Sequence, residues 1–258
     1  MNLHIDVELN YSMAAPTTLL LQIDVADYAG QTIGDNRLEL GSDADSTSVV
    51  TETAVGTRRW IEAQDTFSAH YTCDVLLTRA NPDLPSLSAV PLANLPGAVV
   101  PYLLPSRYIN PLDMMDHVSN TFRDLKGGKV IAAMARWIET TFSYVPGASD
   151  ATTTATDTLD ARKGVCRDYA HVLVAMARAA SIPARMVSTY APHVTPQDFH
   201  AVCEVYLDHA WHLVDPTGMA TAGQMAVVGA GRDAADVSFL TAFGSVTMER
   251  QIVQVSSR

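Results

Sequence analysis

The chain has 258 residues, of which 48% are hydrophobic, enough for one large domain or two modest ones with a sizeable core. Its formal net charge is −11, which argues against nucleic acid or an anionic membrane as partner, because both require a basic face. Its three cysteines, Cys73, Cys166 and Cys203, are far apart and form no CxxC pair, so neither a disulfide framework nor a structural zinc site is expected.

The N-terminus alternates apolar and polar residues and has no basic segment followed by an apolar run. No stretch of about 18 apolar residues follows later in the chain. We therefore expect no signal peptide and no membrane span, and we place the protein in the reducing cytoplasm.

Residues 1–100 have the pattern of β-strands. Leu3, Ile5, Val7 and Leu9 alternate with polar residues, which is typical of a half-buried strand. Further strands are expected at residues 18–25, 37–40, 49–55, 58–62 and 67–78. Together they predict an N-terminal β-sandwich domain over residues 1–100. Six prolines between positions 82 and 105 exclude a regular helix or a central strand there and indicate a linker.

Residues 101–258 alternate helical and strand patterns and are expected to form a second, catalytic domain. Helices are predicted over residues 111–125, 129–142 and 165–180, with a threonine-rich loop between the last two. Strands are predicted at residues 184–190, 201–207 and 211–214, and in the tail at 225–228 and 245–255, with residues 229–236 as a loop. The expected class is α+β, with helices packed on an antiparallel sheet.

Cys166 lies in the first turn of the helix predicted over residues 165–180. Unpaired backbone N–H groups and the positive end of the helix dipole favour the thiolate there, which is the nucleophilic form of cysteine. Arg162, Lys163 and Arg167 add positive charge nearby. The alternative is that Cys166 is a small buried helix residue, which is the commoner fate of a lone cysteine.

The hairpin at residues 201–214 tests whether an imidazole and a carboxylate can meet. If Asp208 and His209 form a two-residue turn, the residue numbers of each cross-strand pair add up to 417. His200 and Asp215 then become diagonal neighbours on one face of the hairpin. Their Cβ atoms would then lie about 5 to 8 Å apart. Such a carboxylate can hold one imidazole nitrogen and leave the other for a thiol. A three-residue turn would break this parity.

The same geometry disfavours the other cysteine and histidine residues nearby as members of the site. Cys203 falls on the strand face opposite His200 and is expected in the core, and His212 faces away from Asp215. His171 lies about 140° round the helix from Cys166, which makes it a poor base for this thiol. A metal site formed by Cys166, His200 and Cys203 would need both faces of one strand, so we expect no metal.

Four motifs occur in an order that resembles the transglutaminase-like superfamily, and in particular bacterial transglutaminase-like enzymes and candidate cysteine proteases. They are Gly-Val-Cys-Arg-Asp-Tyr-Ala at 164–170, Ile-Pro-Ala-Arg at 182–185, Phe-His-Ala at 199–201 and Trp-His-Leu-Val-Asp-Pro-Thr at 211–217. The resemblance covers roughly residues 105–220. It implies a papain-like α+β core, with the nucleophile on a helix packed against an antiparallel sheet.

The resemblance also implies a catalytic triad. Cys166 would be the nucleophile, His200 the general base and acid, and Asp215 the carboxylate that orients the imidazole. The thiolate would attack an amide carbonyl to give a thioester, which water or an amine resolves. The backbone N–H of the nucleophile would be one oxyanion donor, and a second donor is not assignable from the sequence. No calcium loop is visible, so the calcium of the animal enzymes is not carried over, and no cofactor is expected.

Several residues near these motifs have two interpretations. Asp168 could hold a loop of the active site, or it could favour the helix N-terminus by its charge, which we prefer. Arg185 could reach the site, or it could pair with Glu204 on a neighbouring strand, which we prefer. Trp137 and Tyr144 are aromatic candidates near the site, and the stripe that contains Trp137 favours the core for that residue.

The sequence therefore predicts cysteine-dependent acyl transfer at amide bonds of a peptide or protein substrate, with hydrolysis preferred. One alternative is transglutaminase-type amine transfer, which is the same chemistry with another acceptor. The other is a non-catalytic interaction module on the same fold, against which the intact set of cysteine, histidine and aspartate argues. The oligomeric state and the role of the N-terminal domain do not follow from the sequence.

Overall fold

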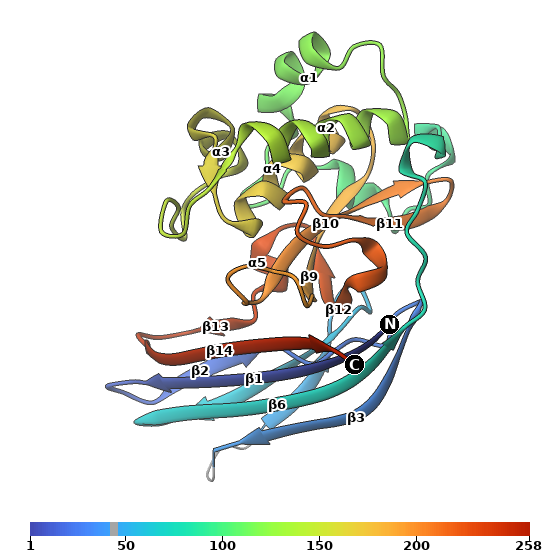
Figure 1. Ribbon diagram of the computed structural model, residues 1–258. Helices are drawn as coiled ribbons and strands as arrows, with labels where there is room; N and C mark the ends of the chain where they lie inside the picture. The colour runs from blue at the N-terminus through green and yellow to red at the C-terminus, as the bar shows by residue number, and fades with distance from the viewer. Residues whose placement is uncertain (42–45) are drawn as a thin grey trace.

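The computed structural model describes residues 1–41 and 46–258. A β-sandwich occupies one end of the molecule, and a compact arrangement of helices on a four-stranded sheet occupies the other (Figure 1). The predicted α+β class is confirmed, with helices packed on an antiparallel sheet and a β-rich sandwich formed largely by the N-terminal residues.

The sandwich consists of two four-stranded antiparallel sheets. The first sheet has the order β14-β1-β6-β3, formed by Thr247–Ser257, Asn2–Ser12, Thr66–Leu77 and Gln31–Leu40. The second sheet has the order β13-β2-β5-β4, formed by Leu240–Ala242, Thr17–Leu21, Thr57–Ala63 and Ser46–Val50. The apolar residues of β1 alternate in burial as predicted, with Leu3, Ile5, Val7 and Leu9 at most 1% exposed.

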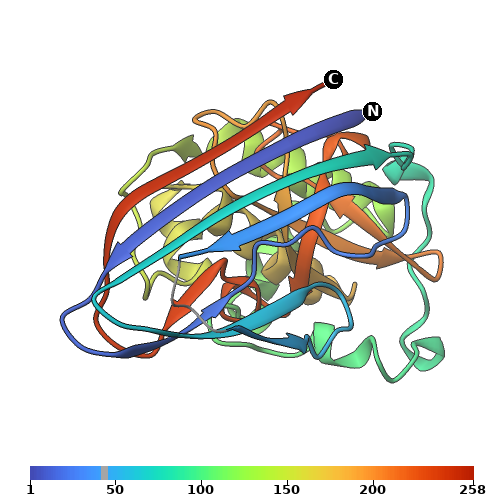
Figure 2. The same cartoon turned by 90° about the horizontal axis from the view of Figure 1, so that it is seen from below.

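The sandwich is completed by the end of the chain. Strand β14 pairs antiparallel with β1 from Leu3 opposite Ser257 to Ser12 opposite Thr247, and β13 pairs with β2. The N-terminal and C-terminal strands therefore run side by side, and both chain ends lie at the same corner (Figure 2). The division at residue 100 stays a prediction; the sheet pairings connect residues on both sides of it.

The proline-rich segment contains only short 3-10 turns, as its composition predicts. These are η1 at Leu84–Ser86, η2 at Leu92–Asn94 and η3 at Val100–Leu103. The segment leads the chain from the sandwich to the helices along one side of the molecule (Figure 1). It contacts α2 closely, since a Cβ atom on Gly128 would lie 1.6 Å from the carbonyl oxygen of Leu84.

The helical layer differs from the prediction in three places. The first helix begins as a 3-10 turn, η4 at Pro111–Met114, and its α-helical part, α1, covers only Met115–Thr121. The threonine-rich segment contains a helix, α3 at Ala155–Ala161, because Thr154 and Asp157 form a reciprocal capping box at its start. Residues 229–236, predicted as a loop, continue strand β12 to Gly231 and then form the short helix α5 at Ala234–Val237.

The two long helices agree with the prediction to within a residue or two. Helix α2 runs over Gly128–Thr141 and α4 over Cys166–Ala179. Helix α4 is buried on nearly all sides, since only Arg167 and Ala179 of its residues are not fully buried. A helix with this burial lies in the centre of a core. None of the helices in the described part of the chain is both long and apolar enough to span a membrane.

Helix α4 packs against the central sheet, whose order is β11-β10-β9-β12. The strands are Ala210–Val214, His200–Leu207, Ala184–Tyr190 and Ala226–Gly231. A small parallel pair, β7 at Ser143–Tyr144 and β8 at Lys163–Gly164, brings the segment after α2 next to the start of α4. The first residues of α4 and β10 lie close to the end of β11, as the contacts of Cys166 with Phe199 and of His200 with Asp215 show.

Candidate active site

Cys166 is the first residue of α4 and follows the extended residue Val165. The residue is 9% exposed, and its Sγ atom lies 3.9 Å from the carbonyl oxygen of Phe199, at the start of β10. The thiol therefore lies near the unpaired backbone N–H groups of the first helical turn, where the helix dipole favours a negative charge. The predicted helix position of Cys166 is confirmed.

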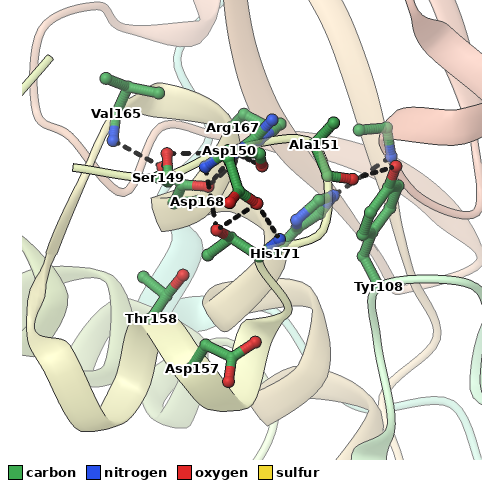
Figure 3. A network of polar contacts seen from close by, with 12 residues as sticks. Tyr108, Ser149, Asp150, Ala151, Asp157, Thr158, Val165, Arg167, Asp168 and His171 are labelled. Atoms are coloured by element: carbon green, nitrogen blue, oxygen red, sulfur yellow. Dashed lines mark hydrogen bonds and ion pairs between the residues drawn. The ribbon is translucent and has the colours of Figure 1, made fainter. Parts of the chain in front are cut away.

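The turn before Cys166 is held by the buried carboxylate of Asp168. Asp168 accepts hydrogen bonds from the backbone N–H of Val165 at 2.8 Å and from the hydroxyl of Ser149 at 2.5 Å, and Arg167 pairs with it at 2.8 Å (Figure 3). Position 164 must be glycine, because a Cβ atom there would lie 2.6 Å from the Asp168 carboxylate. Asp168 thus both caps the helix and holds a neighbouring loop, so both interpretations made from the sequence apply.

The β10–β11 hairpin has the register predicted from a two-residue turn. Leu207 pairs with Ala210 and Cys203 with Val214, and the turn residues Asp208 and His209 have φ angles of 45° and 61°. Positive φ at both central residues is the conformation of a type I′ turn, which continues the twist of the two strands. This register places His200 and Asp215 next to each other.

His200 and Asp215 form a buried ion pair. Nε2 of His200 lies 2.8 Å from Oδ2 of Asp215, and the two side chains are 0% and 1% exposed. The carboxylate also accepts from the hydroxyl of Thr217 at 2.7 Å and from the backbone N–H groups of Thr217 and Ala220, each at 2.9 Å. The Asp215 carboxylate thus has four hydrogen-bond donors, and the three from the residues after β11 fix its orientation toward His200.

The polar contacts outweigh burial in setting the charge of this pair. Burial opposes the charged form of both groups, but the hydrogen bond with Asp215 and the nearby thiol of Cys166 raise the pKa of His200 to about 10. Burial likewise raises the pKa of Asp215, and the contacts with His200 and Thr217 more than offset this and hold it below its usual value. At neutral pH the imidazole is therefore an imidazolium held by a carboxylate.

The thiol of Cys166 is the polar group on the other side of the imidazole. Nε2 points to Asp215, and Nδ1 is buried with no hydrogen-bond partner among the described residues. The Cys166 side chain lies close enough to the ring to raise the pKa of His200. The three residues thus meet in the order thiol, imidazole, carboxylate.

Tyr144 on β7 lies against Cys166 from the opposite side. Its pKa is raised, first by burial and then by the neighbouring thiol of Cys166. The pairing of Tyr144 with Gly164 in the β7–β8 bridge brings it there. The sequence indicates Tyr144 only as an aromatic candidate, because this bridge joins segments that are far apart in the chain.

The rival residues lie outside the site, as predicted. Cys203 is fully buried in the apolar cluster between α4 and the sheet, and Nε2 of His212 lies 3.1 Å from the carbonyl oxygen of Leu207. His171 is buried, stacks on Tyr108 at 5.1 Å and accepts a hydrogen bond from the backbone N–H of Ala234. Within residues 1–41 and 46–258, no three or more His, Cys, Asp or Glu side chains are arranged to hold a metal ion.

Arg185 and Trp137 follow the preferred interpretations. Nε of Arg185 lies 2.7 Å from Oε2 of Glu204 in a buried pair on neighbouring strands. Trp137 packs against the cluster that surrounds α2 and α4, in edge contacts with Phe122 and Phe142. Neither residue contacts the thiol, and each stabilises the core.

Asp198 is a residue near the site that the sequence analysis missed. Its backbone directly precedes Phe199, whose carbonyl oxygen contacts the sulfur of Cys166. Burial raises the pKa of its carboxyl group. The only local signal was its position in the segment Asp-Phe-His-Ala, and the neighbours that surround it come from the distant strand β14.

Three known proteins and one family are similar to this chain. Residues 118–216 match the transglutaminase-like superfamily. A solved structure of a candidate cysteine protease from Cytophaga hutchinsonii superposes with a TM-score of 0.93 and 29% identity, covering 99% of this chain and 90% of that chain. This likeness extends over the sandwich as well as the helical core.

Two curated relatives come from mycobacteria, and both are uncharacterised proteins. One from Mycobacterium leprae is 31% identical over 119 residues, and one from Mycobacterium tuberculosis is 32% identical over 143 residues. These matches cover 43% and 50% of this chain, and 42% and 46% of the relatives. The chain thus matches less than half the length of the curated relatives.

The matched region contains helices α2 and α4, the central sheet up to the end of β11, and the residues Cys166, His200 and Asp215. This part of the chain has a transglutaminase-like core, similar to the transglutaminase-like superfamily. The predicted resemblance is confirmed.

Proposed function

We propose that the protein is a cysteine-dependent enzyme that cleaves amide bonds of a peptide or protein substrate. The observation that carries this proposal is the His200–Asp215 ion pair with the thiol of Cys166 beside it, buried at the junction of α4 and the central sheet. The similarity of residues 118–216 to the transglutaminase-like superfamily supports it, as does the likeness to the candidate cysteine protease.

In the proposed reaction the residues act in two steps. The thiolate of Cys166 bonds to the amide carbon, and His200 donates its proton to the departing nitrogen as the carbon–nitrogen bond breaks. This releases an amine and leaves a thioester. Water then bonds to the thioester carbon and gives its proton to His200, so that a carboxylic acid leaves and the thiolate–imidazolium pair is restored.

Asp215 has a positioning role in this proposal. Its four donors keep the carboxylate in place, and the carboxylate holds Nε2 of His200 so that Nδ1 faces the sulfur. The negative charge formed on the carbonyl oxygen would be stabilised by the backbone N–H of Cys166 and by the hydroxyl of Tyr144, which lies beside the thiol. Tyr144 is thus our candidate for the second oxyanion donor.

Hydrolysis and amine transfer share the first half of this reaction. An amine in place of water would give a new amide through the same thioester. If the thiol were inert, the alternative would be a non-catalytic interaction module on this fold. We propose hydrolysis, supported by the protease-like neighbour with which the whole chain superposes. We propose no cofactor, because thiol, imidazole and carboxylate supply every proton and bond of the two steps.

The test is the alkylation rate of Cys166 by iodoacetamide between about pH 5 and 10, with the modified residue identified by mass. We expect fast modification that changes little from about pH 6 to 9 in the wild type. In His200→Ala the rate should instead rise about tenfold per pH unit up to about 8.5, as for an ordinary thiol. His193→Ala, an exposed residue of the loop before β10, should behave like the wild type.

A wild-type profile that rises like that of an ordinary thiol, and that His200→Ala leaves unchanged, would contradict the proposed enzyme and favour the interaction module. With an active thiol, a peptide library digested in ordinary water and in ¹⁸O-labelled water identifies the acceptor. Hydrolysis places the label in the new carboxyl group, whereas amine transfer gives an unlabelled amide.

A further inference from the structure

Asp198 presents a half-buried carboxylate beside the nucleophile. The carbonyl oxygen of Phe199 lies 3.9 Å from Sγ of Cys166, so Asp198 is one residue away from a direct contact with the sulfur. The Phe199 ring stacks on Phe239 at 4.2 Å and packs against the sandwich core. Asp198 itself lies at a bend, and its side chain reaches Gln251 on strand β14.

Only half of this carboxylate is occupied by the protein. Oδ1 accepts from the backbone N–H of Phe199 at 2.7 Å and from Nε2 of Gln251 on β14 at 2.6 Å. No hydrogen bond among the described residues ends on Oδ2. None of the ion pairs in the described part of the chain includes Asp198, so the protein provides no cation for its charge.

Asp198 lines a pocket between the loop before β10 and strand β14. This pocket has a volume of about 350 Å³ and is lined by Gln197, Asp198 and residues 251–254. That is enough room for a side chain or a small polar group. Burial is the main cause of the raised pKa values of Tyr11 and Tyr144, and the charge of Asp198 adds to both, which places Asp198 near these two hydroxyl groups.

The pocket lacks a positive charge to pair with the carboxylate of Asp198. A carboxylate that is partly removed from water is stabilised by a nearby positive charge. The other polar side chains of the pocket are three neutral glutamines, so a cation that pairs with Asp198 comes from outside the pocket lining. The net charge of −11 also draws cations toward the molecule.

We propose that Asp198 is a specificity-determining residue that binds a positively charged group, an ammonium or guanidinium, of the substrate next to the scissile amide. This inference rests on the proposed function, because it defines a subsite of the same thiol. A lysine or arginine side chain of a peptide carries such a group at the end of a long, flexible stem. Strand β14 supplies one wall, so the sandwich takes part in substrate selection.

Charged thiol reagents test the subsite without a known substrate. Cys166 is treated with methanethiosulfonates that carry a trimethylammonium group, a sulfonate group or no charge, and the modified residue is identified by mass. The measured quantity is the ratio of the cationic to the anionic rate. In Asp198→Asn we expect this ratio to fall about tenfold or more, because local fields of this kind change encounter rates by 10- to 1,000-fold.

The asparagine variant is suited to this test because its Oδ1 can still accept from Phe199 and Gln251, so only the charge and the unoccupied oxygen are changed. Asp208→Asn is the matched control. It removes the same charge from an exposed turn with a φ of 45°, a conformation that asparagine tolerates, and it should leave the ratio within about twofold of the wild type.

A second variant reaches the same result without altering Asp198. In Gln251→Lys the new ammonium lies beside the carboxylate and neutralises it, so the ratio should fall as in Asp198→Asn. An unchanged ratio in both variants, each with a wild-type melting curve, would overturn the inference. The rate with the uncharged reagent and its dependence on His200 test the proposed function separately, so failure of the thiol and failure of the subsite are distinguishable.

Discussion

At the scale of single residues, the turn before Cys166 shows why the sequence around the thiol has so little freedom. Gly164 leaves room for the carboxylate of Asp168, and Asp168 in turn holds the backbone N–H of Val165 and the hydroxyl of Ser149. These contacts bring the first turn of α4 to a defined position next to His200. The short motif is therefore one packed unit in which each residue supports its neighbour.

His171, one turn further along α4, is a buried histidine with a different role. It is fully buried between Tyr108 and the backbone of Ala234, and Nδ1 has no partner among the described residues. Burial, the largest effect, lowers its pKa to about 4, and the attraction of Asp233 offsets this only in part. His171 is therefore neutral in the folded protein at neutral pH.

We expect this histidine to make the protein less stable in mild acid. Between about pH 6.5 and 4 the unfolded chain binds a proton at His171 and the folded chain does not, so the free energy of unfolding falls as the pH falls through this window. The loss approaches about 3 kcal/mol near pH 4. His200 has the opposite effect, because its raised folded pKa makes the free energy of unfolding rise as the pH falls toward about 6.5. Its contribution levels off about one pH unit below that value, where the unfolded chain is protonated as well.

Urea unfolding at a series of pH values measures this effect. In His171→Gln, whose side-chain oxygen can still accept from Ala234, the decline between pH 6.5 and 4 should be shallower than in the wild type. His193→Ala, at an exposed position, should keep the wild-type slope. Equal slopes for all three proteins would show that His171 titrates normally.

At the scale of elements, the β10–β11 hairpin decides whether the imidazole and carboxylate meet. Side chains alternate along a strand, so a change of one residue in the pairing would move Asp215 to the opposite face from His200. The two-residue turn at Asp208 and His209 prevents this, at the expense of positive φ angles in two residues other than glycine. Part of the stability of the hairpin is thus given up to keep its register.

Glycine at position 209 should recover some of that stability. At a φ of 61° a Cβ atom is unfavourable, so His209→Gly should raise the free energy of unfolding by about 1 kcal/mol relative to His209→Ala. The side chain is exposed, which limits other effects. Urea midpoints of the two variants give this difference, and the alkylation profile of Cys166 should not change in either. A glycine variant no more stable than the alanine variant would contradict the turn geometry.

At the scale of the whole molecule, the sandwich and the helical core are tied together by the chain and by packing. The chain begins and ends in the sandwich (Figure 2). The hydroxyl of Tyr190 on β9 donates to the carbonyl oxygen of Ile23 at 2.8 Å, and the ring of Phe199 packs on Phe239. Damage to the sandwich should therefore reach the thiol site, and the two parts should unfold together.

Two buried cysteines allow this coupling to be measured. Cys73 lies in the sandwich core and Cys203 in the cluster beneath α4, so pulsed alkylation in urea reports on each part separately. In the wild type both thiols should become reactive at the same urea concentration. Val253→Asp, which buries a charge at a position that is 4% exposed on β14, should lower both midpoints and cost about 3 kcal/mol or more.

The neighbouring substitution Gln254→Asp provides the control, because this side chain is exposed on the same strand and both midpoints should stay near their wild-type values. If Val253→Asp lowered only the Cys73 midpoint, the helical core would be a unit that folds without the sandwich. That result would support the division of the chain near residue 100 that its proline-rich segment suggests.

The sequence by itself determined the parts of this protein that depend on local chemistry. Alternating apolar residues defined β1, two stripes of apolar residues defined α2 and α4, and the parity of a two-residue turn placed His200 and Asp215 on one face. These features follow from side-chain periodicity and turn geometry, which act over a few residues. One exception was α3, whose capping box lay within a threonine-rich segment and was not recognised.

Only the tertiary structure decided which distant segments surround the thiol. The pairing of β14 with β1, the bridge that carries Tyr144 to Cys166, and the wall that Gln251 forms beside Asp198 all join residues far apart in the chain. Such contacts arise from the burial of complementary surfaces, and no local pattern specifies the partner. For this reason the sequence indicates the proposed nucleophile and its proposed partners, while the side chains that surround them emerge only from the folded chain.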